Sequence, residues 1–267
     1  AQHPLILDTF EQASDALGYD LWALTQQGPA ELLNQTDKTQ PAILTASIAL
    51  WHVWLAEGGA VPAFVAGHSL GEYSALVAAQ SLSLADAVKL VERRGQLMQE
   101  AVPAGQGGMA AILGLDDADV IAACAEAAQG EVVSAVNFNS PGQVVIAGAA
   151  EAVKRAMELC KARGAKRALP LPVSVPSHCE LMRPAAERFA ASIEAIEWQE
   201  PSIALVQNVS AAAVHDLATL KRDLLEQLYK PVRWVESIQC LASHGATQLV
   251  ECGPGKVLAG LNKRCAE

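Results

Sequence analysis

Two spacings of apolar residues alternate along the chain. Residues 61–69, VPAFVAGHS, form a short apolar run that is typical of a buried strand. In residues 70–80, LGEYSALVAAQ, the apolar Ala, Leu and Val recur at helical spacing. This pattern predicts a strand, a sharp turn and a helix in direct succession.

The clearest alternation covers residues 107–172. GMAAILGL predicts a strand, and Asp116 is expected to cap a helix that runs to Ala128. VVSAVNF and QVVIAG flank the turn residues NSPG and predict a hairpin. AEAVKRAMELCKARG then predicts a helix, and KRALPL predicts a last strand. The order β-α-β-β-α-β is that of a ferredoxin-like subdomain.

The rest of the chain predicts the host of this subdomain. A helix is expected from about Leu181, a strand near residues 203–208, helices from about Ala218 and Val232, and a strand in TQLVEC, residues 247–252. Proline and glycine bracket the insert, as expected where a chain leaves and rejoins a host domain: Pro103, Gly105, Pro170, Pro172 and Pro176.

Composition narrows the class of protein. Of the 267 residues 51% are hydrophobic, but their runs break before the roughly 18 residues that a membrane span needs. The opening AQHPLILDTFEQASDAL lacks the pattern of a secretory signal. A net charge of -10 argues against a nucleic-acid surface.

The six cysteines form no Cys-x-x-Cys pair: Cys124, Cys160, Cys179, Cys240, Cys252 and Cys265. Neither a zinc site nor a disulfide framework is therefore expected. We expect a cytoplasmic protein with no metal and no membrane or nucleic-acid partner.

The strongest local motif is Gly67-His68-Ser69-Leu70-Gly71, which fits Gly-x-Ser-x-Gly between a predicted strand and a predicted helix. Small residues suit the tight turn, and the helix start points free N–H groups toward Ser69. Leu70 N–H is the expected first donor to an oxyanion. The alternative is a plain turn in which Ser69 caps the helix.

These features predict an α/β fold. We expect an α/β-hydrolase-like large domain with a mainly parallel sheet, formed by residues 1–103 and 176–267. The ferredoxin-like subdomain is expected at residues 104–175.

Several strings together resemble one family over nearly the whole chain. GHSLGEYSAL, the arginine of VERRGQLM 25 residues after the serine, NFNSPGQVVIAG, LPVSVPSHCELM, EQLYKPVRW and ECGPGKVLAGL are similar to malonyl-CoA:acyl carrier protein transacylases of bacterial fatty-acid synthesis. The resemblance implies transfer of malonyl from malonyl-CoA to the phosphopantetheine thiol of acyl carrier protein through an acyl-serine, with no bound cofactor. Polyketide-synthase acyltransferases share the serine turn but usually carry an aromatic-containing motif around the histidine.

The resemblance also implies roles for other residues. His178 would be the base, and in the resembling family a main-chain carbonyl, which falls on Gln227 here, orients it. The sequence offers no acidic residue in an evident position for a triad. The alternative for Gln227 is a surface glutamine at a helix end, with no role for its side chain. Arg94 would hold the malonyl carboxylate, although arginine pairs on helices usually face solvent. Gln40 would line the malonyl pocket or simply cap the next helix.

Carrier proteins of this pathway are acidic, so basic residues should dock them and meet the phosphates of CoA. The candidates are Lys166, Arg167, Lys256, Lys263 and Arg264. We interpret His52, His68 and His244 as structural. Three other functions fit less well: a serine thioester hydrolase, a trans-acting acyltransferase of a polyketide synthase, and a non-catalytic carrier-binding module.

One family feature is not matched in the sequence as given. The family opens with an apolar strand and a Gly-Gln-Gly-Ser-Gln loop whose glutamine supplies a second oxyanion N–H, whereas this sequence opens with AQHPLILDTF. We therefore expect the working protein to be longer at this end. Loss of one oxyanion donor typically costs about 10² to 10³ in rate.

Overall fold

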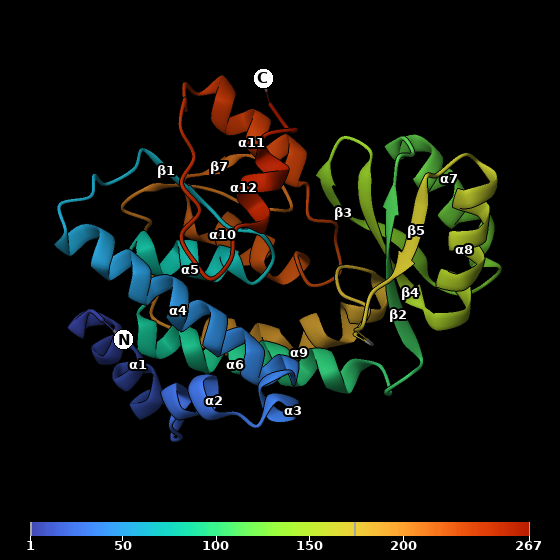
Figure 1. Cartoon of the computed structure of the whole chain (residues 1–267). Coiled ribbons are helices and arrows are strands. Elements are labelled where there is room, and N and C mark those ends of the chain that lie inside the picture. Colours follow the sequence, from blue (N-terminus) through green and yellow to red (C-terminus); the bar gives the residue numbers. More distant parts are fainter. Residues whose placement is uncertain (1, 174, 267) are drawn as a thin grey trace.

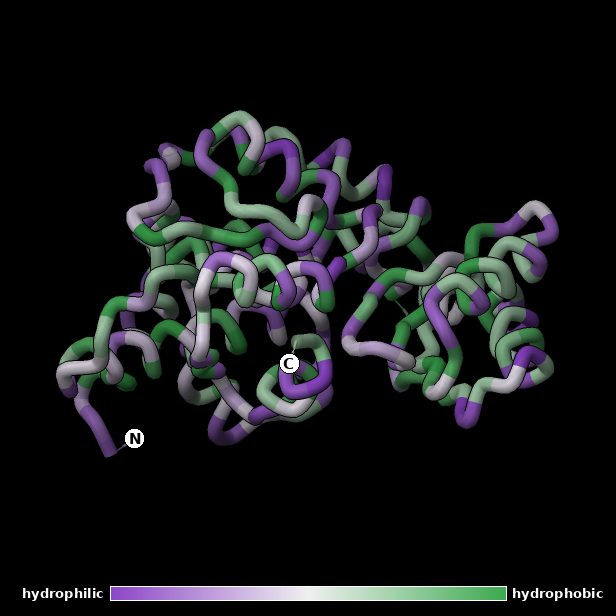
Figure 2. Tube along the Cα trace, turned by 90° about the horizontal axis from the view of Figure 1, so that it is seen from above, coloured by the Kyte–Doolittle hydropathy of each residue, from purple (hydrophilic) through white to green (hydrophobic). Residues whose placement is uncertain are grey.

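Helices and two small sheets form two bodies of unequal size in the computed structural model, which describes residues 2–173 and 175–266. The larger body lies on the left of Figure 1 and the smaller on the right, where β2, β3, β4 and β5 pack with α7 and α8. Figure 2 shows the same two bodies from above. The molecule is therefore a mixed α/β structure, as the sequence predicts.

Helices dominate the larger body, and local sequence explains where several of them start. In α6 the hydroxyl of Ser83 accepts the Asp86 N–H at 3.1 Å, and α1 has Pro4 in its first turn, where no N–H partner is needed. The helices of this body are α1 (Pro4–Leu17), α2 (Leu21–Gln27), α3 (Ala30–Leu33), α4 (Thr36–Ala56), α5 (Gly71–Ala78), α6 (Leu84–Ala101), the 3-10 turn η1 (Glu180–Met182), α9 (Arg183–Glu194), α10 (Leu217–Glu226), α11 (Trp234–Ser243) and α12 (Val257–Asn262).

The sheet of the larger body has three short strands in the order β1-β6-β7. β1 (Phe64–Ala66) runs parallel to β6 (Ala204–Val206), and β7 (Ala213–Val214) is antiparallel to β6. Successive residues of β6 enter different cores, since Leu205 packs among the helices around α4 and α6 while Val206 packs with α11. The expected parallel pairing holds for β1 and β6 only.

The predicted strand at residues 247–252 is wrong, because these residues adopt no regular structure. A strand exists only where its main-chain groups pair with a neighbour. Among the described residues, β1 pairs with β6 alone, and Leu249 and Val250 remain 45% and 62% exposed. Apolar composition suggested a buried strand here, but it could not supply a pairing partner.

The smaller body follows the predicted order of elements closely. Its elements are β2 (Gly107–Leu113), α7 (Asp117–Ala128), β3 (Val133–Ser140), β4 (Gln143–Ala149), α8 (Ala150–Ala162) and β5 (Arg167–Pro170). The sheet order is β3-β4-β2-β5, and every neighbouring pair is antiparallel. Asp116 occupies the N-cap position of α7, but its side chain makes no capping hydrogen bond, contrary to expectation.

The two faces of this second sheet have different neighbours. Residues such as Ala110, Ile112 and Ile146 pack under α7 and α8, whereas Met109 and Val145 pack on the other face, in a cluster with Cys179 of the larger body. The main chain adds a link, because Phe138 N–H donates to Val232 O at 3.0 Å and Val232 N–H to Val136 O at 2.8 Å. The sheet therefore supports the loop that carries His178.

Within the part of the chain that the structure describes, no helix is both long enough and apolar enough to cross a membrane.

Candidate active site

Ser69 lies at the turn between β1 and α5 in a left-handed backbone conformation, with φ 53°. A non-glycine residue rarely adopts this conformation, and its presence at a turn marks a functional constraint. Gly67 is required by close approach, because a Cβ there would overlap the main chain of Gly71 and Glu72. The alternative that Ser69 caps the helix is wrong: Leu70 occupies the N-cap position, and the Ser69 hydroxyl points elsewhere.

The Ser69 hydroxyl is paired with His178. Ser69 Oγ lies 2.8 Å from His178 Nε2, and His178 Nδ1 lies 2.6 Å from the main-chain oxygen of Gln227. A carbonyl oxygen only accepts, so Nδ1 carries the proton and Nε2 is free to accept the serine proton. Burial, with a smaller contribution from the charge of Arg94, lowers the pKa of the His178 imidazole to about 3. The imidazole is therefore neutral near pH 7.

Arg94 reaches the same site from α6 and is only 2% exposed. Its Nη1 donates to Gln40 Oε1 at 2.8 Å, and its Nη2 donates to Gln227 Oε1 at 2.9 Å and to Ser69 Oγ at 3.3 Å. All three acceptors are neutral. Among residues 2–173 and 175–266, no carboxylate forms an ion pair with Arg94, and its Nε has no hydrogen-bond partner. Buried charges are normally paired, so this guanidinium is suited to bind an anion.

Two glutamines fix the arginine, and for both of them the simpler alternative is wrong. Gln40 does not cap a helix, because it lies inside α4, five residues after the N-cap Gln35. The Gln227 side chain is no surface group either, because it is fully buried. Its Nε2 donates to Ser69 O at 3.0 Å, while its own main-chain oxygen orients His178. One residue thus holds nucleophile, base and arginine together.

Two buried polar residues of the site were not singled out from the sequence. Asn208, just after β6, contacts both sides of the serine turn, and Glu72 accepts hydrogen bonds from Asn208 N–H at 2.6 Å and Gln227 Nε2 at 3.1 Å. Burial raises the pKa of the Glu72 carboxyl to about 8. The available signals were a pair of polar residues, Gln207 and Asn208, directly after an apolar strand, and a carboxylate in the first turn of the elbow helix.

Of the two main-chain N–H groups at the turn, one is hydrogen-bonded within the protein and the other is not. Ser69 N–H donates to Asn208 Oδ1 at 2.7 Å, so it is already occupied. In the described chain, Leu70 N–H donates to no other group, and its role as an oxyanion donor stays a prediction. His68 is packed as expected, with its Nε2 2.7 Å from Asn139 Oδ1 and its ring against Trp234.

The predicted docking residues are all exposed, but they fall on both bodies. Lys166 and Arg167 lie at β5, an edge strand of the smaller body, whereas Lys256, Lys263 and Arg264 flank α12. The α12 segment is near the serine turn, since Cys265 Sγ donates to Asn139 O at 3.4 Å and Asn139 contacts His68.

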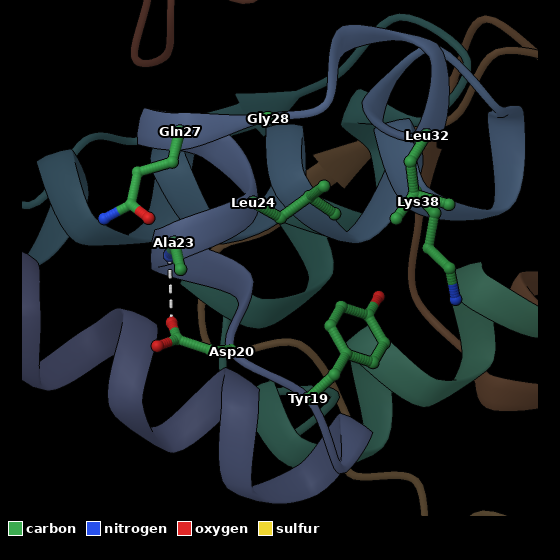
Figure 3. A pocket seen from close by; sticks show the side chains of 8 residues that line it. All are labelled: Tyr19, Asp20, Ala23, Leu24, Gln27, Gly28, Leu32 and Lys38. Atoms are coloured by element: carbon green, nitrogen blue, oxygen red, sulfur yellow. Dashed lines mark hydrogen bonds between the residues drawn. The ribbon is translucent and has the colours of Figure 1, made fainter.

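A separate hollow of about 430 Å³ lies beside α2, and Figure 3 shows its lining. None of its lining residues belongs to the serine site. The residues that line it are Tyr19, Asp20, Ala23, Leu24, Gln27, Gly28, Leu32 and Lys38. The Lys38 ammonium at its rim is already paired with Glu92 at 3.1 Å. This hollow is therefore separate from the site formed by Ser69, His178 and Arg94.

A serine at a strand-to-helix turn, paired with a buried neutral histidine, defines a serine-nucleophile class of site. The chain belongs to the acyl transferase domain family, whose sequence model matches residues 6–265.

Individual relatives extend the similarity to the whole chain. The chain is 60% identical over 267 residues to the malonyl CoA-acyl carrier protein transacylase of Salmonella typhimurium, covering 100% of this chain and 86% of that protein. The Bacillus subtilis protein of the same name is 48% identical over 265 residues, which are 98% of this chain and 83% of that protein.

Solved structures agree with the sequence comparison. The acyl carrier protein S-malonyltransferase of Vibrio cholerae superposes with a TM-score of 0.97 at 58% identity, covering 99% of this chain and 86% of that one. A malonyl-transacylase solved in complex with a type II polyketide-synthase acyl carrier protein gives a TM-score of 0.97 at 56% identity, covering 98% of this chain and 85% of that one.

Proposed function

We propose that this protein transfers a malonyl group from malonyl-CoA to the phosphopantetheine thiol of acyl carrier protein, in fatty acid biosynthesis. The observation that carries the proposal is Arg94, a buried guanidinium without an ion-pair partner in the described chain, 3.3 Å from the hydroxyl of Ser69. In malonyl the free carboxylate is one methylene away from the reacting carbonyl. An acyl group on Ser69 therefore places its carboxylate beside Arg94, where two charge-assisted hydrogen bonds can hold it.

The reaction proceeds in two half-reactions. In the first, His178 Nε2 takes the proton of Ser69 Oγ as the oxygen attacks the thioester carbon, and the proton then passes to the departing CoA sulfur. In the second, the carrier thiol gives its proton to His178 and attacks the serine ester, and Ser69 Oγ recovers the proton. Leu70 N–H faces the oxyanion formed in each step. The atoms balance without a metal or redox group.

Gln227 lets the dyad work without a third carboxylate. Its main-chain oxygen accepts the His178 Nδ1 proton at 2.6 Å and fixes the tautomer that a base requires. The carbonyl carries only a partial charge, so the imidazolium formed during attack is less stabilised than in a triad. The low pKa of His178 favours rapid return of the proton to the leaving group.

We also propose a two-domain description of the fold. The order β2-α7-β3-β4-α8-β5 and the sheet order β3-β4-β2-β5 support a ferredoxin-like subdomain at residues 104–175. The elbow after β1 supports an α/β-hydrolase-like large domain at residues 1–103 and 176–267. Catalytic groups then come from the large domain, and the subdomain supports the His178 loop.

Docking of the carrier is proposed to use the exposed basic residues. Lys256, Lys263 and Arg264 have the strongest support, because the α12 segment contacts Asn139 beside the serine turn. Lys166 and Arg167 are proposed as a second contact on the smaller body. The solved complex of a related transacylase with its carrier protein supports such docking. Six free thiols favour a reducing compartment such as the cytoplasm.

The proposal is tested by mass spectrometry of the intact protein after exposure to malonyl-CoA, followed by addition of carrier protein. A malonyl adduct that maps to Ser69 and then moves to the carrier is expected, and Ser69→Ala should abolish it while keeping a small residue in the elbow. Malonate released to water instead of malonyl-carrier would establish a thioester hydrolase. No adduct at all would favour a carrier-binding module. Comparing the rates of malonyl transfer to fatty-acid and to polyketide carrier proteins shows which of the two pathways the protein serves.

A further inference from the structure

A single buried side chain spans the serine turn. Asn208 follows β6 and is fully buried. Its Oδ1 accepts the Ser69 N–H at 2.7 Å, and its Nδ2 donates to the Gly67 carbonyl at 2.7 Å. The amide therefore contacts the peptide groups on both sides of His68, with one acceptor and one donor in the required places.

These contacts act on the strained part of the turn. Ser69 has φ 53°, a conformation that is unfavourable for a residue with a side chain unless its surroundings hold it. One of the two hydrogen bonds of Asn208 holds Ser69 itself, and the other holds Gly67, two residues earlier. The first of these bonds also occupies Ser69 N–H, which leaves Leu70 N–H as the donor directed at an oxyanion. Asn208 thus affects both the nucleophile and its oxyanion donor without reaching substrate.

Asn208 is itself tightly held. Its main-chain N–H donates to Glu72 Oε1 at 2.6 Å, and its oxygen accepts the Arg233 N–H at 3.2 Å. Its Oδ1 also receives Gln227 Nε2 at 3.3 Å. Because Gln227 orients His178 and binds Arg94, a displacement of Asn208 would reach all three reactive groups.

We propose that Asn208 is a positioning residue for acyl transfer, whose side-chain amide holds the strained serine turn so that Ser69 Oγ faces His178. This inference rests on the proposed function where it names an acyl substrate, whereas the contacts of Asn208 do not depend on that function. The chemistry makes a specific demand: position 208 must offer an acceptor to Ser69 and a donor to Gly67. Asparagine does so at any pH, and a protonated aspartic acid has the same shape and the same pair of groups.

Replacement by aspartate therefore gives a readout that a purely structural role would not produce. In the Asn208→Asp variant, the ionised side chain would direct a carboxylate oxygen at the Gly67 carbonyl, which is repulsive, whereas the protonated form restores both hydrogen bonds. Full burial raises the pKa of a carboxyl at this position well above that of an exposed one. The ionisable residues in contact with Asn208 are Glu72 and, through its main chain, Arg233. Asp223 and Arg94 act on the neighbouring Glu72, and the positive charge of Arg94 opposes the rise.

The experiment measures acylation of Ser69 per folded molecule between about pH 5 and about pH 7, using malonyl-CoA and, separately, phenylmethanesulfonyl fluoride. The second reagent sulfonylates a serine activated by histidine, with loss of fluoride and the serine proton, and needs no acyl recognition. Asn208→Leu keeps the shape but removes both hydrogen bonds. The matched control Asn34→Asp introduces the same charge at an exposed position.

We expect Asn208→Leu to react about 10- to 100-fold more slowly with both reagents, the usual effect of leaving buried groups unpaired. Asn208→Asp should be comparably slow at the higher pH and recover by at least about tenfold as the pH falls. Wild type and Asn34→Asp should stay level, because His178 remains neutral throughout. Circular dichroism at each pH gives the folded fraction.

Wild-type rates per folded molecule in Asn208→Leu, or no recovery of Asn208→Asp at low pH, would overturn the inference. If Asn208→Leu does not fold, Asn208→Asp carries the comparison alone, since its protonated form restores both contacts. If wild type forms no malonyl adduct but the sulfonyl fluoride reaction shows the expected pattern, the proposed function fails while the positioning role stands.

Discussion

Arg94 and the serine it neighbours set the selectivity expected of this site. Arg94→Ala should reduce malonyl transfer far more than acetyl transfer, because only malonyl presents a carboxylate and the lost charge-assisted contact is worth about 1.5 to 3 kcal/mol. That energy corresponds to a drop of roughly 10- to 150-fold in the malonyl-to-acetyl ratio of kcat/KM. The adjacent Arg93→Ala, which removes only a 3.4 Å contact to Gln96, is the control. Equal losses for both acyl groups would show a structural role for Arg94.

The pH dependence follows from the lowered pKa of His178. A base whose pKa lies near 3 is fully neutral above about pH 5, so acylation should be level between about pH 5 and about pH 7. This window also lies below the raised pKa of Glu72, about 8, so that Glu72 keeps its proton. In Arg94→Ala the cation is gone, the pKa of His178 rises, and the acid limb moves to higher pH. Rates of acetylation measured against pH check the wild type and Arg94→Ala. A wild-type rate that already falls at the ordinary pKa of histidine would contradict the prediction.

The predictability of the site differed from residue to residue. Ser69 could be predicted because its motif and its strand-helix context are local, and His178 and Arg94 because their strings resemble a family. Asn208 and Glu72 could not, because the contacts of Asn208 with the serine turn and with Glu72 join residues separated by 136 to 141 positions in the chain. The two alternatives for the Gln227 side chain could not be decided for the same reason, since a buried and a surface glutamine at a helix end look alike in sequence.

At the scale of elements, prediction succeeded where local pattern and local partners coincide. The strands β2 and β4 and the helices α7 and α8 carry their own periodicity and pack against neighbours close in sequence. The predicted strand at residues 247–252 failed, because strand formation depends on a pairing partner that composition does not reveal. The extent of β1 was overestimated as well, since residues 61–63 precede it without pairing.

The elbow between β1 and α5 gives a stability test. Gly67→Ala should lower the free energy of unfolding by about 1 to 3 kcal/mol and slow acylation, because its Cβ would overlap the main chain of Gly71. Gly260→Ala in α12 is the matched control, since a Cβ there meets nothing within 4 Å and alanine favours helix by about 0.5 to 1 kcal/mol. Urea denaturation measures both. Equal stabilities for the two variants would mean that the turn tolerates a larger residue.

At the scale of the whole molecule, the net charge of -10 makes docking of an acidic carrier depend on local charge. Reversing Lys263 and Arg264 to glutamate should raise KM for the carrier several-fold at low salt, with the difference shrinking as salt screens the surface. The same reversal at Lys154 and Lys161, exposed on α8, is the control and should change KM little. Steady-state rates against carrier concentration at two salt concentrations decide between the surfaces.

Arg94, which pairs with no carboxylate among the described residues, also affects the protein before any substrate arrives. The buried guanidinium of Arg94, beside the hydroxyl of Ser69, attracts small anions from solution. Chloride, formate or free malonate should therefore compete with malonyl-CoA. At constant ionic strength, exchanging a bulky anion for formate should therefore raise KM for malonyl-CoA and leave that for acetyl-CoA nearly unchanged. The apparent substrate preference of the protein would then depend on the buffer as well as on its sequence.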